Sequence, residues 1–228
     1  MAFEGFSEQT IDFLYGIFFQ NERRWFAAHK DEYLTHLQRP MKALADETFQ
    51  RLTALYPRKD LVCRVARIYR DARRCRGINF YKESLWFTLQ PPAEPGQDYP
   101  CFWFELGRET WSYGMGFWMP SAATMARHRT AIDAAPQQLG RLHARLLTQA
   151  EFLLEGERYA RFKTGAPPDL AGWYNMKAFS LQHESIDVTE TFDGPALVER
   201  LVNGFSFLMP YYDYFLPLSQ AGQPRQVP

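Results

Sequence analysis

Three strand-like stretches follow one another with no helix between them, and this order limits what the chain can fold into. The stretches "SLWFTLQ" (84–90), "YPCFWFEL" (99–106) and "TWSYGMGFW" (110–118) are rich in β-branched and aromatic residues. The loop "PPAEPGQD" has three prolines, which exclude a strand, and Gly107 lies in a short connection that predicts a hairpin over 99–118. Parallel neighbours need a long crossover between them. The sequence therefore predicts an α+β fold with a mainly antiparallel sheet, rather than a doubly wound parallel one.

Helices are predicted on both sides of these strands. Apolar residues recur every three or four positions in the first sixty residues, which gives the fold a helical N-terminal region. N-cap residues and prolines mark where helices begin. The predicted starts are Ser7, Pro40, Ser121, Pro136 and Asp193 with Pro195, the second of these helices ending before Pro57. Two further strands are predicted at 61–69 and 177–184.

The composition of the chain and the lack of a linker-like segment predict one intracellular domain. We expect a single α+β domain over 1–218 and a disordered polar tail over 219–228. Three cysteines without a C-x-x-C pair and an N-terminus without a secretory signal favour the cytoplasm. The apolar run "FLYGIFF" is far short of the ~20 residues that cross a bilayer, so no membrane partner is expected. With 26 basic and 26 acidic residues, the neutral chain is unlike a general nucleic-acid binder.

The segment "RIYRDARRCRGINFYK" (67–82) concentrates positive charge. Residues 64–82 hold seven cations and one acid, and arginine recurs at every third position from 64 to 76. Neither a helix nor a strand keeps a period of three on one face. We therefore expect the strand to end near Tyr69 and a loop to carry the remaining arginines.

Two interpretations of this segment stay open. One is a solvated loop whose cations form ion pairs with acids elsewhere, each worth about 0–1 kcal/mol. The other is an anion site, because arginine holds carboxylate or phosphate with two hydrogen bonds. In that case Asp71 orients one guanidinium while a neighbour faces the ligand. The candidate ligand-binding residues in this segment are Arg70, Asp71, Arg73, Tyr81 and Lys82.

Four stretches resemble one protein family. They are "FEGFSEQTIDFLYGIFFQNERRWFAAHKDEYLTHLQRPMKAL" (3–44), "RIYRDARRCRGINFYK", "YGMGFWMP" (113–120) and "WYNMKAFSL" (173–181). The first matches a pattern of G-F, F-L, N-x-R-x-W-F, H-K-x-x-Y and P-M. Together they resemble the bacterial and fungal family called domain of unknown function 2461. The resemblance implies an α+β fold and supplies no established activity.

The second motif is only partly kept. The family pattern runs R-D-x-R-F-[ST]-x-D-K-x-P-Y-K, and Arg70, Asp71, Arg73, Tyr81 and Lys82 match it. The departures are Arg74, Cys75, Gly77, Ile78 and Phe80, which remove one acid and one base. The resemblance therefore identifies a divergent member with an altered motif. It also adds Lys177, which matches a family lysine after two aromatic residues, as a sixth candidate ligand-binding residue.

Other motifs give weaker signals. Cys75 lies between two arginines that favour a thiolate, but no histidine is near enough in sequence to serve as its base, so we expect no catalytic role. Gly114 and Gly116 precede a helix start at Ser121, which predicts either close backbone packing or a ligand contact beside an anion-binding helix end. The five histidines form no metal motif, so neither a metal nor a cofactor is predicted.

Three function classes remain. The first is binding, with or without turnover, of a small phosphate- or carboxylate-bearing molecule at the arginine-rich segment. The second is a non-catalytic protein-interaction domain, since aromatics and arginine are enriched at interfaces. The third is single-stranded nucleic-acid binding, in which aromatic residues among the arginines stack on bases. These aromatic residues are Tyr69, Phe80, Tyr81, Trp86 and Phe87.

Overall fold

The fold was analysed in a computed structural model that describes residues 2–71, 73, 79–93 and 97–220. Contacts between Cα atoms divide the chain into two compact units, which are described separately. The first comprises Met1–Leu89, Trp103–Tyr113 and Glu184–Ser206, and the second comprises Gln90–Phe102, Gly114–His183 and Phe207–Pro228. The organisation as one domain over 1–218 stays a prediction.

The strands form a six-stranded antiparallel sheet in the order β1-β2-β3-β4-β6-β5. Their bounds are β1 Val62–Val65, β2 Ser84–Gln90, β3 Cys101–Gly107, β4 Trp111–Phe117, β5 Leu153–Glu155 and β6 Phe179–Ser185. Strands β3 and β4 are the predicted hairpin, and the Gly107 amide donates to the Thr110 carbonyl across its turn at 2.8 Å. The predicted α+β class with a mainly antiparallel sheet is confirmed. Strand β5, which pairs with β6, was not predicted.

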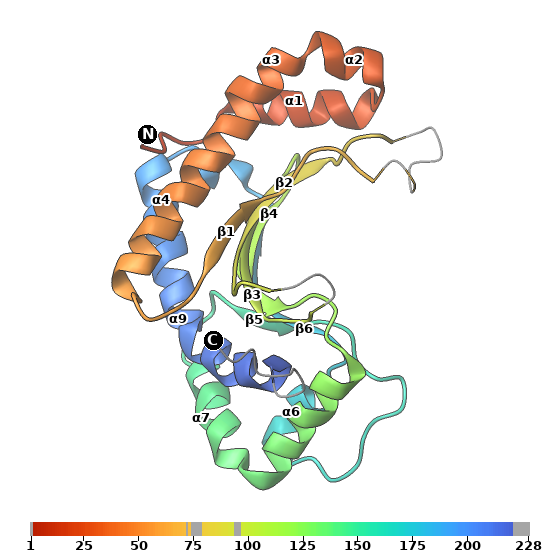
Figure 1. Ribbon diagram of the computed structural model, residues 1–228, viewed down its shortest axis with the longest axis vertical. Coiled ribbons are helices and arrows are strands. Elements are labelled where there is room, and N and C mark those ends of the chain that lie inside the picture. The colour runs from red at the N-terminus through yellow and green to blue at the C-terminus, as the bar shows by residue number, and fades with distance from the viewer. Residues whose placement is uncertain (1, 72, 74–78, 94–96, 221–228) are drawn as a thin grey trace, which may run out of the picture. The chain divides into compact units, whose positions relative to one another are not determined.

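The helices, all but α8 labelled in Figure 1, include five that begin close to the predicted starts. Their bounds are α1 Glu8–Phe19, α2 Arg23–Ala28, α3 Lys30–Glu32, α4 Arg39–Leu55, α6 Ala122–Ala134, α7 Pro136–Leu146, α8 Ala171–Tyr174 and α9 Gly194–Gln220. A π-helical segment, Tyr33–Gln38, precedes α4, and 3₁₀ turns occupy Pro168–Leu170 and Val188–Thr191. None of the helices in the described ranges is long and apolar enough to cross a membrane. Of the predicted tail, residues 221–228 lie outside the described residues.

A hydrogen bond near Pro40 links α1 to the π-helical segment. Proline has no N–H, so residue 40 cannot donate the α-helical hydrogen bond to the carbonyl of His36, four residues earlier. The buried Thr10 hydroxyl on α1 donates to that carbonyl at 2.6 Å. At the start of α1, the Ser7 amide donates to the same Thr10 oxygen at 3.1 Å. One threonine therefore satisfies polar groups in two helical segments.

In the first unit, one face of the strands packs into the hydrophobic core. Leu85, Phe87 and Leu89 of β2 alternate with half-buried residues. Phe104 of β3 contacts Phe87 and Phe6, with ring centroids 5.8 Å and 6.1 Å away. Helix α4 packs along β1, as Figure 1 shows. The outer face, opposite the core, carries the half-buried side chains of Ser84, Trp86, Trp103 and Glu105.

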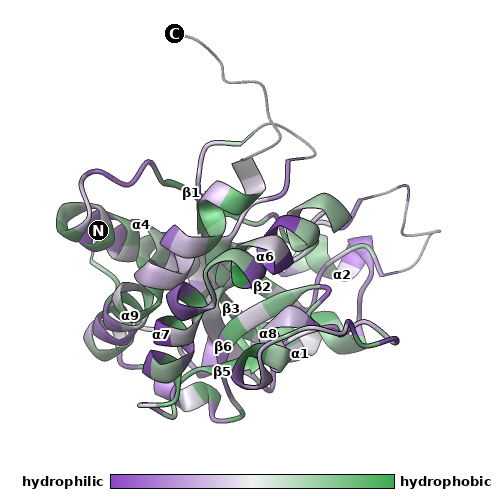
Figure 2. Cartoon of the chain, turned by 90° about the horizontal axis from the view of Figure 1, so that it is seen from below, coloured by the Kyte–Doolittle hydropathy of each residue, from purple (hydrophilic) through white to green (hydrophobic). Residues whose placement is uncertain are grey.

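In the second unit, Phe215 of α9 is the centre of an aromatic core. Its ring centroid lies 4.4 Å from Phe179, 5.1 Å from His128 and 6.0 Å from Phe117. Helix α7 buries Leu139 and leaves polar residues exposed, and in Figure 2 it carries both purple and green segments. Apolar burial of this kind is the main driving force for folding.

Candidate functional site

The basic segment forms a two-stranded extension of β1 and β2, which we call the basic arm (residues 66–83). Strand β1 ends at Val65, earlier than predicted, but the chain pairs again where Tyr69 and Tyr81 form an antiparallel bridge. The Arg70 amide donates to the Phe80 carbonyl at 2.9 Å, and the Lys82 amide donates to the Ile68 carbonyl at 2.8 Å. Residues 72 and 74–78, which include the departures Arg74, Cys75, Gly77 and Ile78, lie outside the described residues. The matched motif residues Arg70, Asp71, Arg73, Tyr81 and Lys82 are described.

Residues of the first motif hold the arm in place. The Asn21 side chain donates to the Tyr81 carbonyl at 3.0 Å and accepts from the Tyr81 amide at 2.9 Å. The Arg23 guanidinium lies 4.5 Å from the Phe80 ring centroid. The Phe26 ring stacks on Tyr81 with centroids 4.1 Å apart. The pattern N-x-R-x-W-F therefore supports the second motif, a role that sequence reasoning missed although both motifs were visible.

Tyr81, one of the predicted ligand residues, has its ring in the core. Its side chain is 4% exposed and contacts Phe26 and Tyr69. Burial, followed by the neighbouring Tyr69, raises the pKa of the Tyr81 hydroxyl, and Arg23 opposes the rise. The structure therefore gives this ring a positioning role in the arm.

Asp71 holds the Arg73 guanidinium with two hydrogen bonds. The Arg73 Nε donates to Oδ1 at 3.1 Å and the Arg73 Nη2 donates to Oδ2 at 2.8 Å. The Arg73 amide also donates to Oδ1, at 3.0 Å. The Arg73 side chain is 90% exposed, so solvent screens this fork and it contributes little to stability. Asp71 therefore holds the guanidinium of Arg73, and its role as an orienting residue of an anion site stays a prediction.

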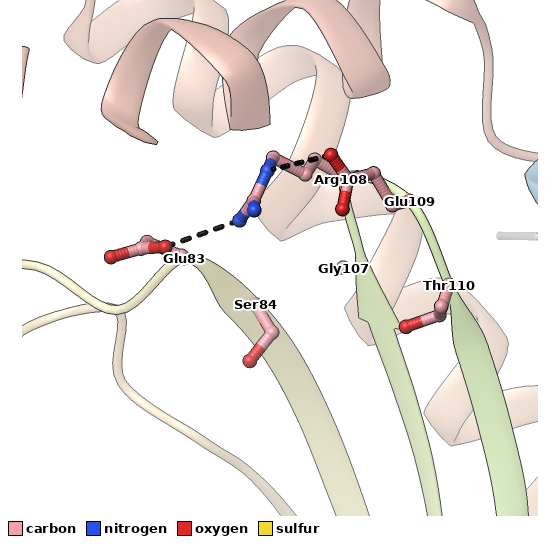
Figure 3. A pocket seen from close by; sticks show the side chains of 6 residues that line it. All are labelled: Glu83, Ser84, Gly107, Arg108, Glu109 and Thr110. Carbon is pink, nitrogen blue, oxygen red and sulfur yellow. Dashed lines mark hydrogen bonds and ion pairs between the residues drawn. The ribbon is translucent and has the colours of Figure 1, made fainter. Parts of the chain in front are cut away.

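Arg70 is directed toward Glu83 at the base of the arm. Its Nε donates to the Tyr81 carbonyl at 2.8 Å, and its Nη2 lies 3.7 Å from Glu83 Oε1. Figure 3 shows Glu83 beside a second guanidinium, that of Arg108, whose Nη1 lies 3.2 Å from Glu83 Oε2. The same Arg108 contacts Glu109 at 3.4 Å. Two arginines therefore share the single negative charge of Glu83, which cannot balance both of their positive charges.

Lys82 has no carboxylate bound to it in the part of the chain that the structure describes. Its ammonium donates to the Arg67 carbonyl at 2.6 Å and lies 4.1 Å from the Trp86 ring centroid. Burial lowers the pKa of Lys82, the charge of Arg70 lowers it further, and Glu105 opposes both. The ammonium thus lies on the outer face, where it senses the charges of both Arg70 and Glu105.

Lys177 belongs to the second unit, where its ammonium contacts Glu157 Oε2 at 2.8 Å. This bond raises the pKa of Lys177, and the side chain is largely exposed. The pair is a surface ion pair of the kind that contributes little to stability.

The Gly116 region is closely packed. A Cβ atom at Gly116 would lie 2.3 Å from the Phe179 carbonyl oxygen and 2.7 Å from the Ser180 Cα. Glycine therefore lets β4 approach β6 at this point. The start of α6 already faces a carboxylate, because the Ser121 amide donates to Asp98 Oδ2 at 2.7 Å. This contact disfavours the alternative of an external anion at that helix end.

Thiol and metal chemistry find little support in the described residues. Burial raises the pKa of Cys101 to about 12. Burial and the charge of Asp46 raise the pKa of Cys63 to about 12 as well. Both thiols therefore stay protonated at neutral pH and are weak nucleophiles. Within the described ranges, no three His, Cys, Asp or Glu side chains are grouped so as to hold a metal ion.

Comparison with known families gives one match. The model of a family described as "Conserved hypothetical protein (DUF2461)" matches residues 9–214. Comparison with curated proteins gives no match. The family match includes the first motif from Gln9 onward, the whole basic arm and the segment around Lys177. The chain therefore belongs to the DUF2461 family of conserved hypothetical proteins.

Proposed function

We propose that the protein binds a small phosphate- or carboxylate-bearing molecule on the outer face of the basic arm, at Lys82 and Arg70. The anionic group would lie against these two cations. A planar part of the same molecule would lie along Trp86, whose ring is half-buried beside Lys82.

The unbalanced charge of the arm carries this proposal. Between residues 62 and 83 the described cations are Arg64, Arg67, Arg70, Arg73 and Lys82, whereas the described acids are Asp71 and Glu83. Asp71 is occupied by Arg73, and Glu83 is shared with Arg108. Like charges at close range disfavour each other's charged forms. An anion near Lys82 and Arg70 would relieve that repulsion.

The aromatic residues of the outer face support a ligand with a planar part. Ser84 donates to Glu105 Oε1 at 2.6 Å across β2 and β3, which places these residues on one face. Because side chains on a strand alternate, Trp86 and Trp103, two positions away, lie on that same face. Trp rings provide large contact areas with little loss of side-chain entropy.

The test compares thermal stability with and without phenyl phosphate, inorganic phosphate and benzoate. A ligand at 100 times its Kd adds about 2.7 kcal/mol to the free energy of unfolding. We expect a ligand-dependent shift in the wild type that is lost in Lys82→Met, a change that removes the charge and keeps an apolar stem over Trp86. Lys163→Met, which removes an exposed lysine of the second unit that is not a candidate ligand residue, is the matched control. A shift that survives in Lys82→Met would reject the site.

A protein-interaction function is the second candidate, and one observation favours it. Trp118 and Met119, adjacent residues after β4, are 88% and 79% exposed. Exposed tryptophan and methionine are typical of binding surfaces. A photo-crosslinking residue at position 118 would capture such a partner in cells, with the same residue at the exposed Glu184 as control. Equal capture from both positions would argue against it.

Nucleic-acid binding ranks third. Of the aromatic residues expected to stack on bases, Tyr81 and Phe87 are buried in the core and cannot reach a base. The pair of Lys82 with Trp86 places one ring beside one cation, which suits a single base better than a strand. Filter binding at two salt concentrations tests this, because phosphate contacts weaken steeply as salt rises.

We also propose that this binding takes place in the cytoplasm and within one domain over 1–218. The described cysteines, Cys63 and Cys101, are free thiols, as expected in a reducing compartment. Fractionation of cells expressing a tagged protein would test the compartment. Limited proteolysis would test the domain, since a single domain should lose only its tail at early times.

A further inference from the structure

A pocket of about 270 Å³ lies in the first unit, where the π-helical segment and the start of α4 face the end of β1. Its lining residues come from two regions of the chain. They are Tyr33, Gln38 and Lys42 from the helical side, and Val65, Ala66, Arg67, Ile68 and Tyr69 from the strand side. The pocket shares no lining residue with the Lys82 and Arg70 site proposed above.

Every charged side chain that lines this pocket is positive. Lys42 and Arg67 are both exposed, and neither forms an ion pair with any residue that the structure describes. Asp46, one turn after Lys42 on α4, lies near Cys63 and does not line the pocket. Two cations around one concave space create a positive potential, which favours an anion of charge close to two.

The π-helical segment brings a polar pair to the same wall. Residues five apart differ by about 140° around an α-helix, so their side chains do not meet. The wider π turn brings Gln38 beside Tyr33, and Gln38 Nε2 donates to the Tyr33 hydroxyl at 3.3 Å. Burial raises the pKa of that hydroxyl, so it keeps its proton at neutral pH and can donate it. π-Helical turns occur often at functional sites.

We propose that this pocket binds the phosphate group of a small phosphate monoester, with Lys42 and Arg67 as its cationic ligands and the Tyr33 hydroxyl as a third donor. The charge of two matches a phosphate dianion better than a carboxylate. The arginine fork suits phosphate oxygens. The volume of about 270 Å³ is just below the roughly 300–1,000 Å³ of typical ligand pockets, so it suits a small molecule. Tyr69, which is 52% exposed, offers a wall for that group.

Isothermal titration with phenyl phosphate, inorganic phosphate and benzoate tests the proposal. We expect phenyl phosphate to bind the wild type, and Lys42→Met and Arg67→Met each to weaken it about tenfold or more, since each removes a charge-assisted hydrogen bond. Tyr33→Phe keeps the ring and should weaken binding less. Arg64→Met is the matched control, because Arg64 is an exposed arginine of β1 that does not line the pocket.

The outcomes separate this site from the one on the outer face. If Lys42→Met and Arg67→Met lose phenyl phosphate binding while Lys82→Met keeps it, the result supports this pocket and counts against the outer-face site. If Lys82→Met loses binding while the other two variants keep it, the pocket is overturned. Benzoate binding as tightly as phenyl phosphate would overturn the assignment to phosphate. Equal loss in Arg64→Met would show general charge attraction and would also overturn it. Thermal unfolding of each unliganded variant checks that the fold is intact.

Discussion

The ring of Phe26 lies nearly parallel to that of Tyr81, with centroids 4.1 Å apart and an angle of 13° between the planes. Phe26 is on α2 and Tyr81 is on the returning strand of the basic arm. This stack and the two hydrogen bonds between the Asn21 side chain and the Tyr81 backbone hold the returning strand of the arm against α2 and the residues before it. The arm can therefore present its cations from a defined position.

Removing the Tyr81 ring should destabilise the protein strongly. We expect Tyr81→Ala to lower the free energy of unfolding by about 3–5 kcal/mol, because it leaves a cavity against Phe26. Tyr81→Phe should stay within about 0.5 kcal/mol, since the hydroxyl makes no hydrogen bond with a described residue. Urea unfolding measures both. If Tyr81→Phe kept full stability but lost ligand binding, the hydroxyl would be a ligand contact, as the sequence predicted.

Asn21→Ala should loosen the arm. The change removes hydrogen bonds to the amide and the carbonyl of Tyr81, and unsatisfied buried groups cost about 1–3 kcal/mol. Amide hydrogen exchange of the arm should accelerate with the loss of stability. Asn203→Ala is the matched control, because the exposed Asn203 bonds only Glu199 within its own helix, and its cost should stay below about 0.5 kcal/mol. Similar costs for both would show that the arm does not depend on Asn21.

Two glycines should respond in opposite directions to alanine. Gly116→Ala brings a Cβ to 2.3 Å from a backbone oxygen, so we expect a loss of about 1–3 kcal/mol or failure to fold. At Gly140, inside α7, nothing lies within 4 Å of a Cβ. Gly140→Ala should therefore stabilise the protein by about 0.5–1 kcal/mol through helix propensity. Thermal unfolding of the two variants decides this, and a stable Gly116→Ala would contradict the close packing of β4 on β6.

His128 should make stability fall in mild acid. Burial lowers the pKa of His128 from 6.5 to about 4, the Trp173 carbonyl opposes this, and Arg129 adds to it. Because the unfolded chain binds the proton more readily, the stabilisation is complete above pH 6.5 and is lost as the pH falls toward 4. At 1.36 kcal/mol per pKa unit the total is about 3 kcal/mol.

The measurement is the free energy of unfolding from pH 7.5 to 4 for the wild type and for His128→Leu. The wild type should lose more stability than the variant over this range, because the variant has no proton to gain at that position. Parallel curves for the two proteins would show that another group causes the acid sensitivity.

Local patterns predicted much of the fold. Strand β2 and helix α6 begin where alternation and the Ser121 cap predict them, because these signals depend on residues a few positions apart. The short edge strand β5 escaped prediction because it has three residues and none of them is buried, so it shows no apolar alternation. Likewise, the Asp71 and Arg73 fork joins residues two apart, and its acid was identified from sequence.

The sequence by itself determined the α+β class, the charge of the basic arm and the two motifs that mark the family. Only the tertiary structure decided which side chains of the arm are available. The Tyr81 ring packs on Phe26 in the core, and the Tyr81 backbone is hydrogen-bonded to the Asn21 side chain. Asn21 and Tyr81 are 60 positions apart in the sequence. Lys42 and Arg67 meet at one pocket for the same reason, since the packing of a helix on a strand joins them. Such contacts depend on the packing of whole elements, which no local pattern encodes.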